Sequence, residues 1–94
     1  MKDKAKGAPS QVKAVYSALL KNAEKVYSEF SEAAVSCYTS GKEWRVGSNF
    51  EDGHHTMIFR DDKWFTRNPW SGEDTEMRNG FDEAIGTAHI YFTG

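Results

Sequence analysis

The sequence predicts an α+β fold in which one long N-terminal amphipathic helix packs on a three- or four-stranded, mainly antiparallel sheet. Apolar side chains recur at helical spacing through residues 10–39. From residue 43 onward, the hydrophobic pattern changes to a period of two that is interrupted by short turn sequences. A chain of 94 residues can bury one small core. We therefore assign residues 10–94 to a single domain and residues 1–9 to a flexible basic tail.

The predicted helix is longer than a compact domain of this size can accommodate. It begins with Ser10, whose hydroxyl can cap the first-turn amides, and it ends near Gly41, which can adopt a left-handed C-cap. A helix over residues 10–39 would be roughly 45 Å long, whereas a compact chain of this length has a diameter near 30 Å, an order-of-magnitude comparison. The helix is therefore expected either to kink around residues 28–31 or to form a homodimer with a second copy. The apolar positions that define it are Val12, Val15, Tyr16, Leu19, Leu20, Ala23, Val26, Tyr27, Phe30, Ala33, Ala34, Cys37 and Tyr38.

Three strand segments follow the predicted helix. "EWRVGSNF" (43–50) and "HHTMIFR" (54–60) flank the turn "EDG" (51–53), in which a glycine in the left-handed conformation can close a hairpin loop. The second turn, "RDDK", leads into "WFTRN" (64–68). These segments predict an antiparallel meander.

The register of these strands decides which face of the sheet packs on the helix. The register that we predict aligns Val46, Ile58 and Phe65 on the helix side, together with Trp44 and Phe50. Because side chains alternate along a strand, a slip of one residue would exchange the two faces. In this register the opposite, exposed face carries Arg45, Asn49, His55, Met57, Phe59, Trp64 and Thr66.

The remaining segment combines a long loop with a fourth strand. Residues 69–85 contain proline and glycines without a sustained period, so they are predicted to form a loop with one helical turn at 81–85. This loop either projects into solvent or lies over the second face of the sheet. The alternating segment "TAHIYFTG" (87–94) predicts an additional strand.

No catalytic or metal-binding pattern is present. His54 and His55 are adjacent and would point to opposite faces of a strand, so they cannot share an ion without distortion. Cys37 lies within the apolar arc of the predicted helix, where a thiol behaves as a small hydrophobic group. We therefore predict no metal, no cofactor and no enzymatic activity. A small enzyme with His54, His55 or His89 as general base is the second alternative.

An aromatic sheet face and an acidic loop together predict a protein-binding surface. Clustered carboxylates speed encounter with a basic partner, and tryptophan is prominent among the residues that dominate binding energy. Trp70, which follows Pro69, would either fold back on the core or project as an anchor. The predicted partner-binding residues are Phe59, Trp64, Met57, Arg45, Trp70, Glu73, Asp74 and Glu76.

These observations favour a small non-enzymatic inhibitor or antagonist that docks on the basic surface of a protein, for example a nucleic-acid-handling protein. Immunity proteins and phage-encoded antagonists of bacterial defence have this size and character, so a phage or bacterial origin is expected. The absence of an apolar signal-peptide core and the single cysteine favour the cytoplasm. The net charge of −2 gives no general attraction to nucleic acid or to a membrane.

The first alternative is a module that binds single-stranded nucleic acid. In it, bases would stack on the exposed rings, and Arg45, Arg60, Lys63 and Arg67 would contact phosphates.

Overall fold

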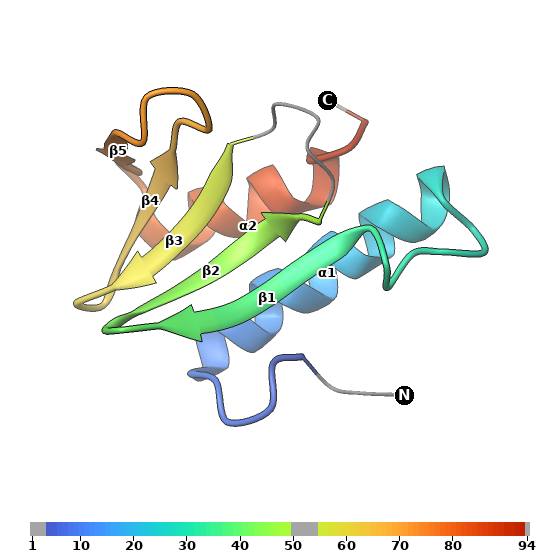
Figure 1. Ribbon diagram of the computed structural model, residues 1–94, viewed down its shortest axis with the longest axis horizontal. Helices are drawn as coiled ribbons and strands as arrows, with labels where there is room; N and C mark the ends of the chain where they lie inside the picture. The colour runs from blue at the N-terminus through green and yellow to red at the C-terminus, as the bar shows by residue number, and fades with distance from the viewer. Residues whose placement is uncertain (1–3, 50–54, 94) are drawn as a thin grey trace.

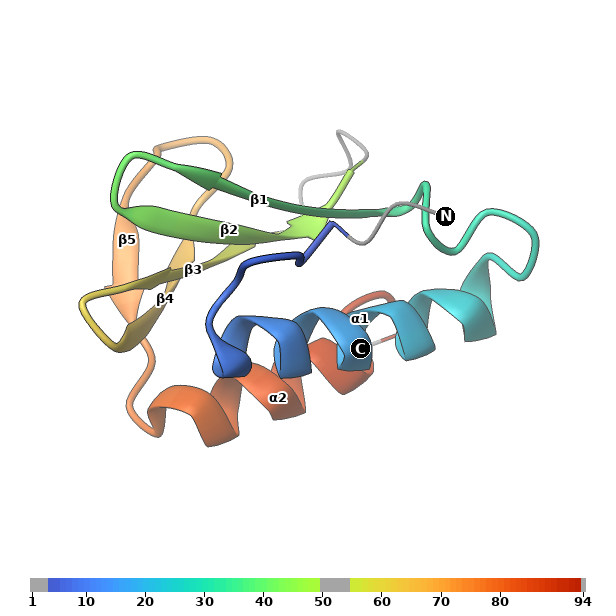
Figure 2. The ribbon, with the colours of Figure 1, turned by 90° about the horizontal axis from the view of Figure 1, so that it is seen from below.

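The computed structural model describes residues 4–49 and 55–93. In these residues an N-terminal and a C-terminal helix pack on one face of a five-stranded antiparallel sheet, which confirms the α+β class (Figure 1). The strands follow one another in the order β1-β2-β3-β4-β5, and Figure 2 shows the sheet and the helices as two layers. The radius of gyration is 12.1 Å. The elements are α1 (Ser10–Val26), β1 (Val35–Ser40), β2 (Glu43–Ser48), β3 (Thr56–Arg60), β4 (Lys63–Arg67), β5 (Asp74–Glu76) and α2 (Gly80–Ile90).

Helix α1 is shorter than predicted. It begins at Ser10, but Pro9 occupies the N-cap position and no side chain caps the helix, so the predicted capping role of Ser10 is wrong. The helix ends at Val26 after 17 residues, which corresponds to roughly 25 Å and fits within the longest dimension of the molecule, 34 Å. The prediction of a continuous helix over residues 10–39 is therefore wrong. The overhang from which we inferred a kink or a homodimer does not exist.

The second half of the predicted helix is strand β1. Val35 and Cys37 point to the core, while the intervening Ser36 is half-buried and Tyr38 is exposed on the opposite face. Apolar residues spaced this way satisfy a helical arc and a strand alternation equally well, which explains the wrong assignment. Gly41 does not end a helix. It has a φ of +62° and takes the first position of the two-residue hairpin loop between β1 and β2, where a glycine is favoured.

The register of β3 differs from the predicted one by one residue. Val46 pairs with Met57 instead of Ile58, and Trp44 pairs with Phe59. The predicted partnership of Ile58 with Phe65 across β3 and β4 is confirmed.

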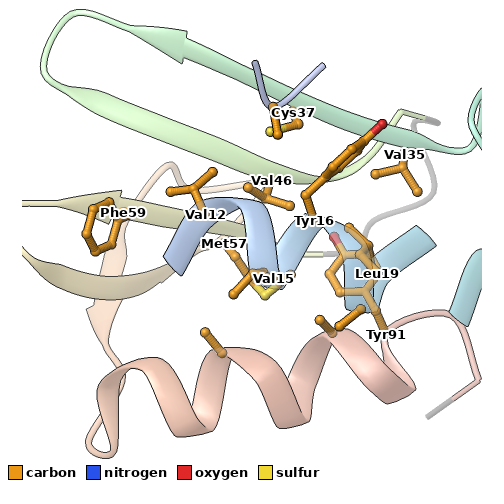
Figure 3. Packing of buried hydrophobic residues seen from close by; sticks show 14 of the residues in the cluster. Val12, Val15, Tyr16, Leu19, Val35, Cys37, Val46, Met57, Phe59 and Tyr91 are labelled. Atoms are coloured by element: carbon orange, nitrogen blue, oxygen red, sulfur yellow. The ribbon is translucent and has the colours of Figure 1, made fainter. Parts of the chain in front are cut away.

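The slip exchanges the faces of β3 and β4. Met57, Phe59 and Trp64 point toward the helices and belong to the core, so their predicted placement on the exposed face is wrong. Figure 3 shows Met57 and Phe59 beside Val12 and Val15 of α1. Trp64 is fully buried, its ring lies 5.0 Å from that of Phe59, and its Nε1 donates to Oε1 of Gln11 at 3.0 Å. The indole thus fills the core without leaving its polar atom unsatisfied.

The C-terminal segment is a helix. The prediction of a strand at 87–94 is wrong, and the predicted loop 69–85 contains β5 and the first turns of α2. Ala84 and Ala88, four residues apart, are fully buried against the rest of the fold. Asp82 and Glu83 lie in the first turn, where carboxylates interact favourably with the helix dipole.

The two helices are joined at their C-terminal ends. The buried side chain of Asn22 on α1 accepts a hydrogen bond from the backbone N–H of Phe92 at 2.6 Å and donates to Oγ1 of Thr93 at 3.2 Å. The rings of Tyr27 and Phe92 meet edge to face, with their centroids 5.5 Å apart.

Tyr91 connects α2 to the sheet. Its hydroxyl donates to the carbonyl of His55 and accepts from the backbone N–H of Ser48 at 3.3 Å. Gly47 makes this approach possible, because a Cβ atom at that position would lie 3.0 Å from the tyrosine oxygen. The phenol therefore fixes the ends of β2 and β3 against the C-terminal helix.

Residues 4–9, which were expected to form part of a basic tail, contact the domain. Ala5 and Ala8 are buried, and Nζ of Lys4 donates to the carbonyl of Glu32 at 2.9 Å and to that of Val35. Figure 2 shows this segment beside β1. The predicted turn 51–53, Phe50 and His54 lie outside the described residues.

The tight turn between β3 and β4 generates a prediction about stability. Asp61 and Asp62 have φ values of 52° and 59°, so a pair of non-glycine residues occupies left-handed positions where Asn-Gly is preferred. We expect Asp62→Gly to raise the free energy of unfolding by about 0.5–1 kcal/mol, because glycine removes the conformational strain. Urea denaturation followed by circular dichroism measures the change.

The control for this variant is Gly41→Ala, the reverse substitution in the other two-residue turn. No atom lies within 4 Å of the added Cβ, so its effect is conformational. It should lower the free energy of unfolding by about 1 kcal/mol. A lower urea midpoint for Asp62→Gly would contradict the assignment of strain to this turn.

Candidate functional site

The face of the sheet that points away from α1 and α2 is the candidate functional surface, which we call the outer sheet face. Figure 1 views the molecule onto this face, with both helices behind the strands. Ile58 is fully buried here although no helix covers it. By strand alternation and register, the outer sheet face carries Ser36, Tyr38, Glu43, Arg45, Thr56, Ile58, Arg60, Lys63, Phe65, Arg67, Asp74 and Glu76.

An ion network crosses four strands of the outer sheet face, with Arg67 at its centre. The Nε atom of Arg67 donates to Oδ1 of Asp74 at 2.7 Å, and its Nη1 atom donates to Oε2 of Glu43 at 2.8 Å. Arg60 joins the same Asp74 through Nη1 at 2.5 Å, and Arg45 joins the same Glu43 through Nε at 2.6 Å. Three arginines thus share two carboxylates, and the network keeps a charge of about +1.

The same network shifts the ionisation of its members. The hydrogen bonds from Arg67 and then Arg60 lower the pKa of Asp74 from 3.8 to about 2, against the opposing effect of burial. Arg67, followed by Arg45, also lowers the pKa of Glu43. The pKa of Arg67 is raised by Asp74 and Glu43. Glu43 and Asp74 are therefore ionised at neutral pH.

Aromatic rings extend the arginine network. The guanidinium of Arg60 lies over the ring of Phe65, 4.0 Å from its centroid. Arg45 contacts Tyr38, whose hydroxyl accepts a hydrogen bond from Nη1 at 3.2 Å. These contacts cover part of the apolar surface that the sheet exposes.

Trp70 projects from the loop between β4 and β5. Its side chain is 77% exposed, so the alternative in which it folds back on the core is wrong. The loop is nevertheless ordered, because Oδ1 of Asn68 accepts hydrogen bonds from the backbone N–H groups of Trp70 at 2.8 Å and Ser71 at 2.9 Å. The indole contacts the ring of His55 edge to face, with a centroid distance of 6.5 Å.

The predicted acidic loop is divided among different elements. Asp74 belongs to the ion network, and Asp82 and Glu83 belong to the first turn of α2. Glu73 and Glu76 remain exposed and form no ion pair within the described part of the chain. The structure therefore brings five of the eight predicted binding residues to the outer sheet face or its rim with exposed or half-buried side chains, namely Arg45, Trp70, Glu73, Asp74 and Glu76.

The site contains a pocket that the sequence analysis missed. It is an open depression of about 260 Å³ in the outer sheet face. Its lining residues come from four different strands, so no local sequence pattern predicts the pocket. The lining includes Ser36, Tyr38, Arg45, Thr56, Ile58 and Arg67.

Metal-ligating side chains are dispersed over the described residues. Across residues 4–49 and 55–93, no three His, Cys, Asp or Glu side chains converge as a metal site would require. Cys37 is buried on β1, His55 lies exposed directly before β3, and His89 lies exposed on α2. No helix in that part of the chain is long and apolar enough to cross a membrane.

No family model, curated protein or solved structure matches this chain. The structural class of the protein is therefore assigned from its fold. It is a two-layer α+β protein whose sheet has one face covered by helices and one charged outer face.

The ion network predicts how stability depends on pH. Because the pKa of Asp74 is depressed in the folded state, its contribution is present above its unfolded value of 3.8 and is lost as the pH falls toward about 2. We expect Asp74→Asn to lower the free energy of unfolding at pH 7 by about 1–2 kcal/mol, allowing for partial exposure of the network. Urea denaturation should show that the free energy of unfolding falls less for the variant than for the unmodified protein as the pH is lowered from 3.8 to about 2.

Glu76→Gln supplies the matched control on the same strand, since Glu76 lies outside the network. Its denaturation curves should superimpose on those of the unmodified protein at both ends of this pH range. If Asp74→Asn behaves as Glu76→Gln does, the network contributes nothing to stability.

Proposed function

We propose that this protein is a non-enzymatic binding protein that docks on a partner protein through Trp70 and the adjoining outer sheet face. The exposure of Trp70 on an ordered loop is the observation that carries the proposal. An exposed indole gains much from burial, and tryptophan is enriched among the residues that dominate interface energies.

The loop around Trp70 favours binding because it is already organised. Besides the bonds to Asn68 Oδ1, the backbone N–H of Asn68 donates to the carbonyl of Glu73 at 2.9 Å, and that of Gly72 donates to the carbonyl of Asn68 at 2.8 Å. A loop that is fixed in advance loses less conformational entropy when it binds. Trp70 can therefore serve as an anchor without a large ordering cost.

The charges near Trp70 support a partner with a basic surface. Glu73 lies in the same loop as Trp70, and Glu76 lies on β5. Neither carboxylate is neutralised by an ion pair within the described residues. The arginine network keeps a charge of about +1, so we assign the contact with a basic partner to Glu73 and Glu76 rather than to that network. Such exposed carboxylates increase the rate of encounter with a positively charged surface.

Met57, Phe59 and Trp64 have no place in this docking surface, because their burial leaves too little area for contact with a partner. The same burial weakens the nucleic-acid alternative, which needs Phe59 and Trp64 as stacking rings. Arg60 and Arg67, which that alternative uses for phosphate contacts, already bind carboxylates. The inhibitor or antagonist class, of the immunity-protein or phage anti-defence type, remains our proposal for the role of the complex.

The test is affinity capture from the cells that produce the protein, with a Trp70→Ala variant and a matched Phe30→Ala control. Phe30 is also strongly exposed, at 66%, but follows α1, away from the β4–β5 loop. We expect the unmodified protein and Phe30→Ala to retain the same partner and Trp70→Ala to lose it. With the purified partner, Trp70→Ala should raise Kd by about thirtyfold or more, the effect of losing a hot-spot residue.

A double variant, Glu73→Gln with Glu76→Gln, tests the basic partner surface. Its association rate should fall, and the remaining rate should depend less on salt concentration than that of the unmodified protein. Equal capture by the unmodified protein and Trp70→Ala, with unchanged circular dichroism, would refute the proposed docking surface.

A further inference from the structure

The pocket in the outer sheet face has the chemistry of an anion site. Two guanidinium groups, of Arg45 and Arg67, line it, and no carboxylate does. The carboxylates that pair with these arginines, Glu43 and Asp74, belong to the ion network and are not among the lining residues. The pocket therefore presents hydrogen-bond donors and positive charge toward its opening.

Arg45 retains donors that the described protein does not use. A guanidinium carries five N–H groups. Nε donates to Glu43 and Nη1 donates to the hydroxyl of Tyr38, whereas Nη2 forms no hydrogen bond with the described residues. The two existing bonds hold the planar group in place, so the remaining N–H groups are already oriented.

Arg67, by contrast, is nearly saturated. Its Nε, Nη1 and Nη2 atoms all donate to Glu43 or Asp74, with Nη2 donating to both. It contributes positive potential to the pocket, while Arg45 contributes direct hydrogen bonds.

Hydroxyl groups from the neighbouring strands complete the donor set. The hydroxyl of Thr56 on β3 makes no hydrogen bond to another described residue, and the half-exposed Tyr38 on β1 uses its oxygen as an acceptor, so its proton is available to donate. Ile58 lies beneath this lining and is fully buried. Donors thus approach the pocket from β1, β2 and β3.

We propose that this pocket binds the phosphate group of a small phosphate monoester. A phosphate has three terminal oxygens that can accept hydrogen bonds from three directions, whereas a carboxylate presents two oxygens in one plane. Arg45, Tyr38 and Thr56 line the pocket from three different strands, so their donors can approach such a group from more than one side. This inference does not depend on the docking of a protein partner at Trp70.

Phenyl phosphate is the probe for this proposal, titrated into the ¹⁵N-labelled protein at constant ionic strength. We expect saturable changes in the backbone amide signals of Tyr38, Arg45 and Thr56. Arg45→Gln should weaken binding by about tenfold or more, because it removes a charged donor, and Thr56→Val by a few-fold. Lys63→Gln removes another cation from the outer sheet face, outside the pocket lining, and should leave the affinity unchanged.

Benzoate distinguishes phosphate from carboxylate recognition in the same titration. Weaker binding of benzoate supports the proposal, and equal or tighter binding overturns it. Absence of saturable changes with phenyl phosphate, or an equal loss of affinity in Lys63→Gln and Arg45→Gln, also overturns it. If Arg45→Gln does not fold, Thr56→Val decides the question, because valine keeps the shape of the side chain and removes only the hydroxyl.

Discussion

Two helices on one side of a five-stranded sheet cover only one of its faces, and this one-sided cover assigns opposite roles to alternate residues of each strand. The inward positions supply the apolar core. The outward positions have no helix to pack against, so they rely on one another. Arg67 takes the central place among them, because it holds carboxylates from β2 and β5 at the same time. The outer sheet face is therefore a charged surface whose ion pairs replace a second apolar layer.

The sequence contained enough information for the α+β class and the central strands. Residues 43–48, 56–60 and 63–67 alternate strongly, and "RDDK" allows little besides a two-residue turn. That turn pairs Arg60 with Lys63, so both charges share one face. If the face that carries Arg60 and Lys63 is exposed to solvent, side-chain alternation places Phe59 and Trp64 on the opposite face, toward the core. The predicted alignment of Val46 with Ile58 gives an apolar row but the wrong register.

Two elements could not be assigned from local patterns. The apolar spacing in residues 35–40 fits both a helix and a strand. Pairing with β2 makes this segment a strand, and the local pattern does not encode that pairing. The same ambiguity affects 87–94, where Ala88 of α2 and Tyr91, directly after the helix, are both buried. For the candidate site, the polar loop indicates exposed carboxylates around Trp70; Glu73 and Glu76 are exposed, whereas Asp74 is half-buried in the ion network. The pocket was not foreseeable, because it requires the register of four strands at once.

The order of the strands has a consequence for how the chain acquires its structure. Each strand pairs only with its neighbours in sequence, so the sheet consists of hairpins with low contact order, which favours rapid formation. Closure of the core, by contrast, requires contacts between residues far apart in the sequence. Asn22 and Phe92, whose hydrogen bond joins α1 to the C-terminal segment, are separated by 70 positions. During synthesis, the inner face of the sheet therefore stays partly uncovered until residues 80–93 leave the ribosome. In that interval the nascent chain exposes its aromatic core and depends most on protection from aggregation.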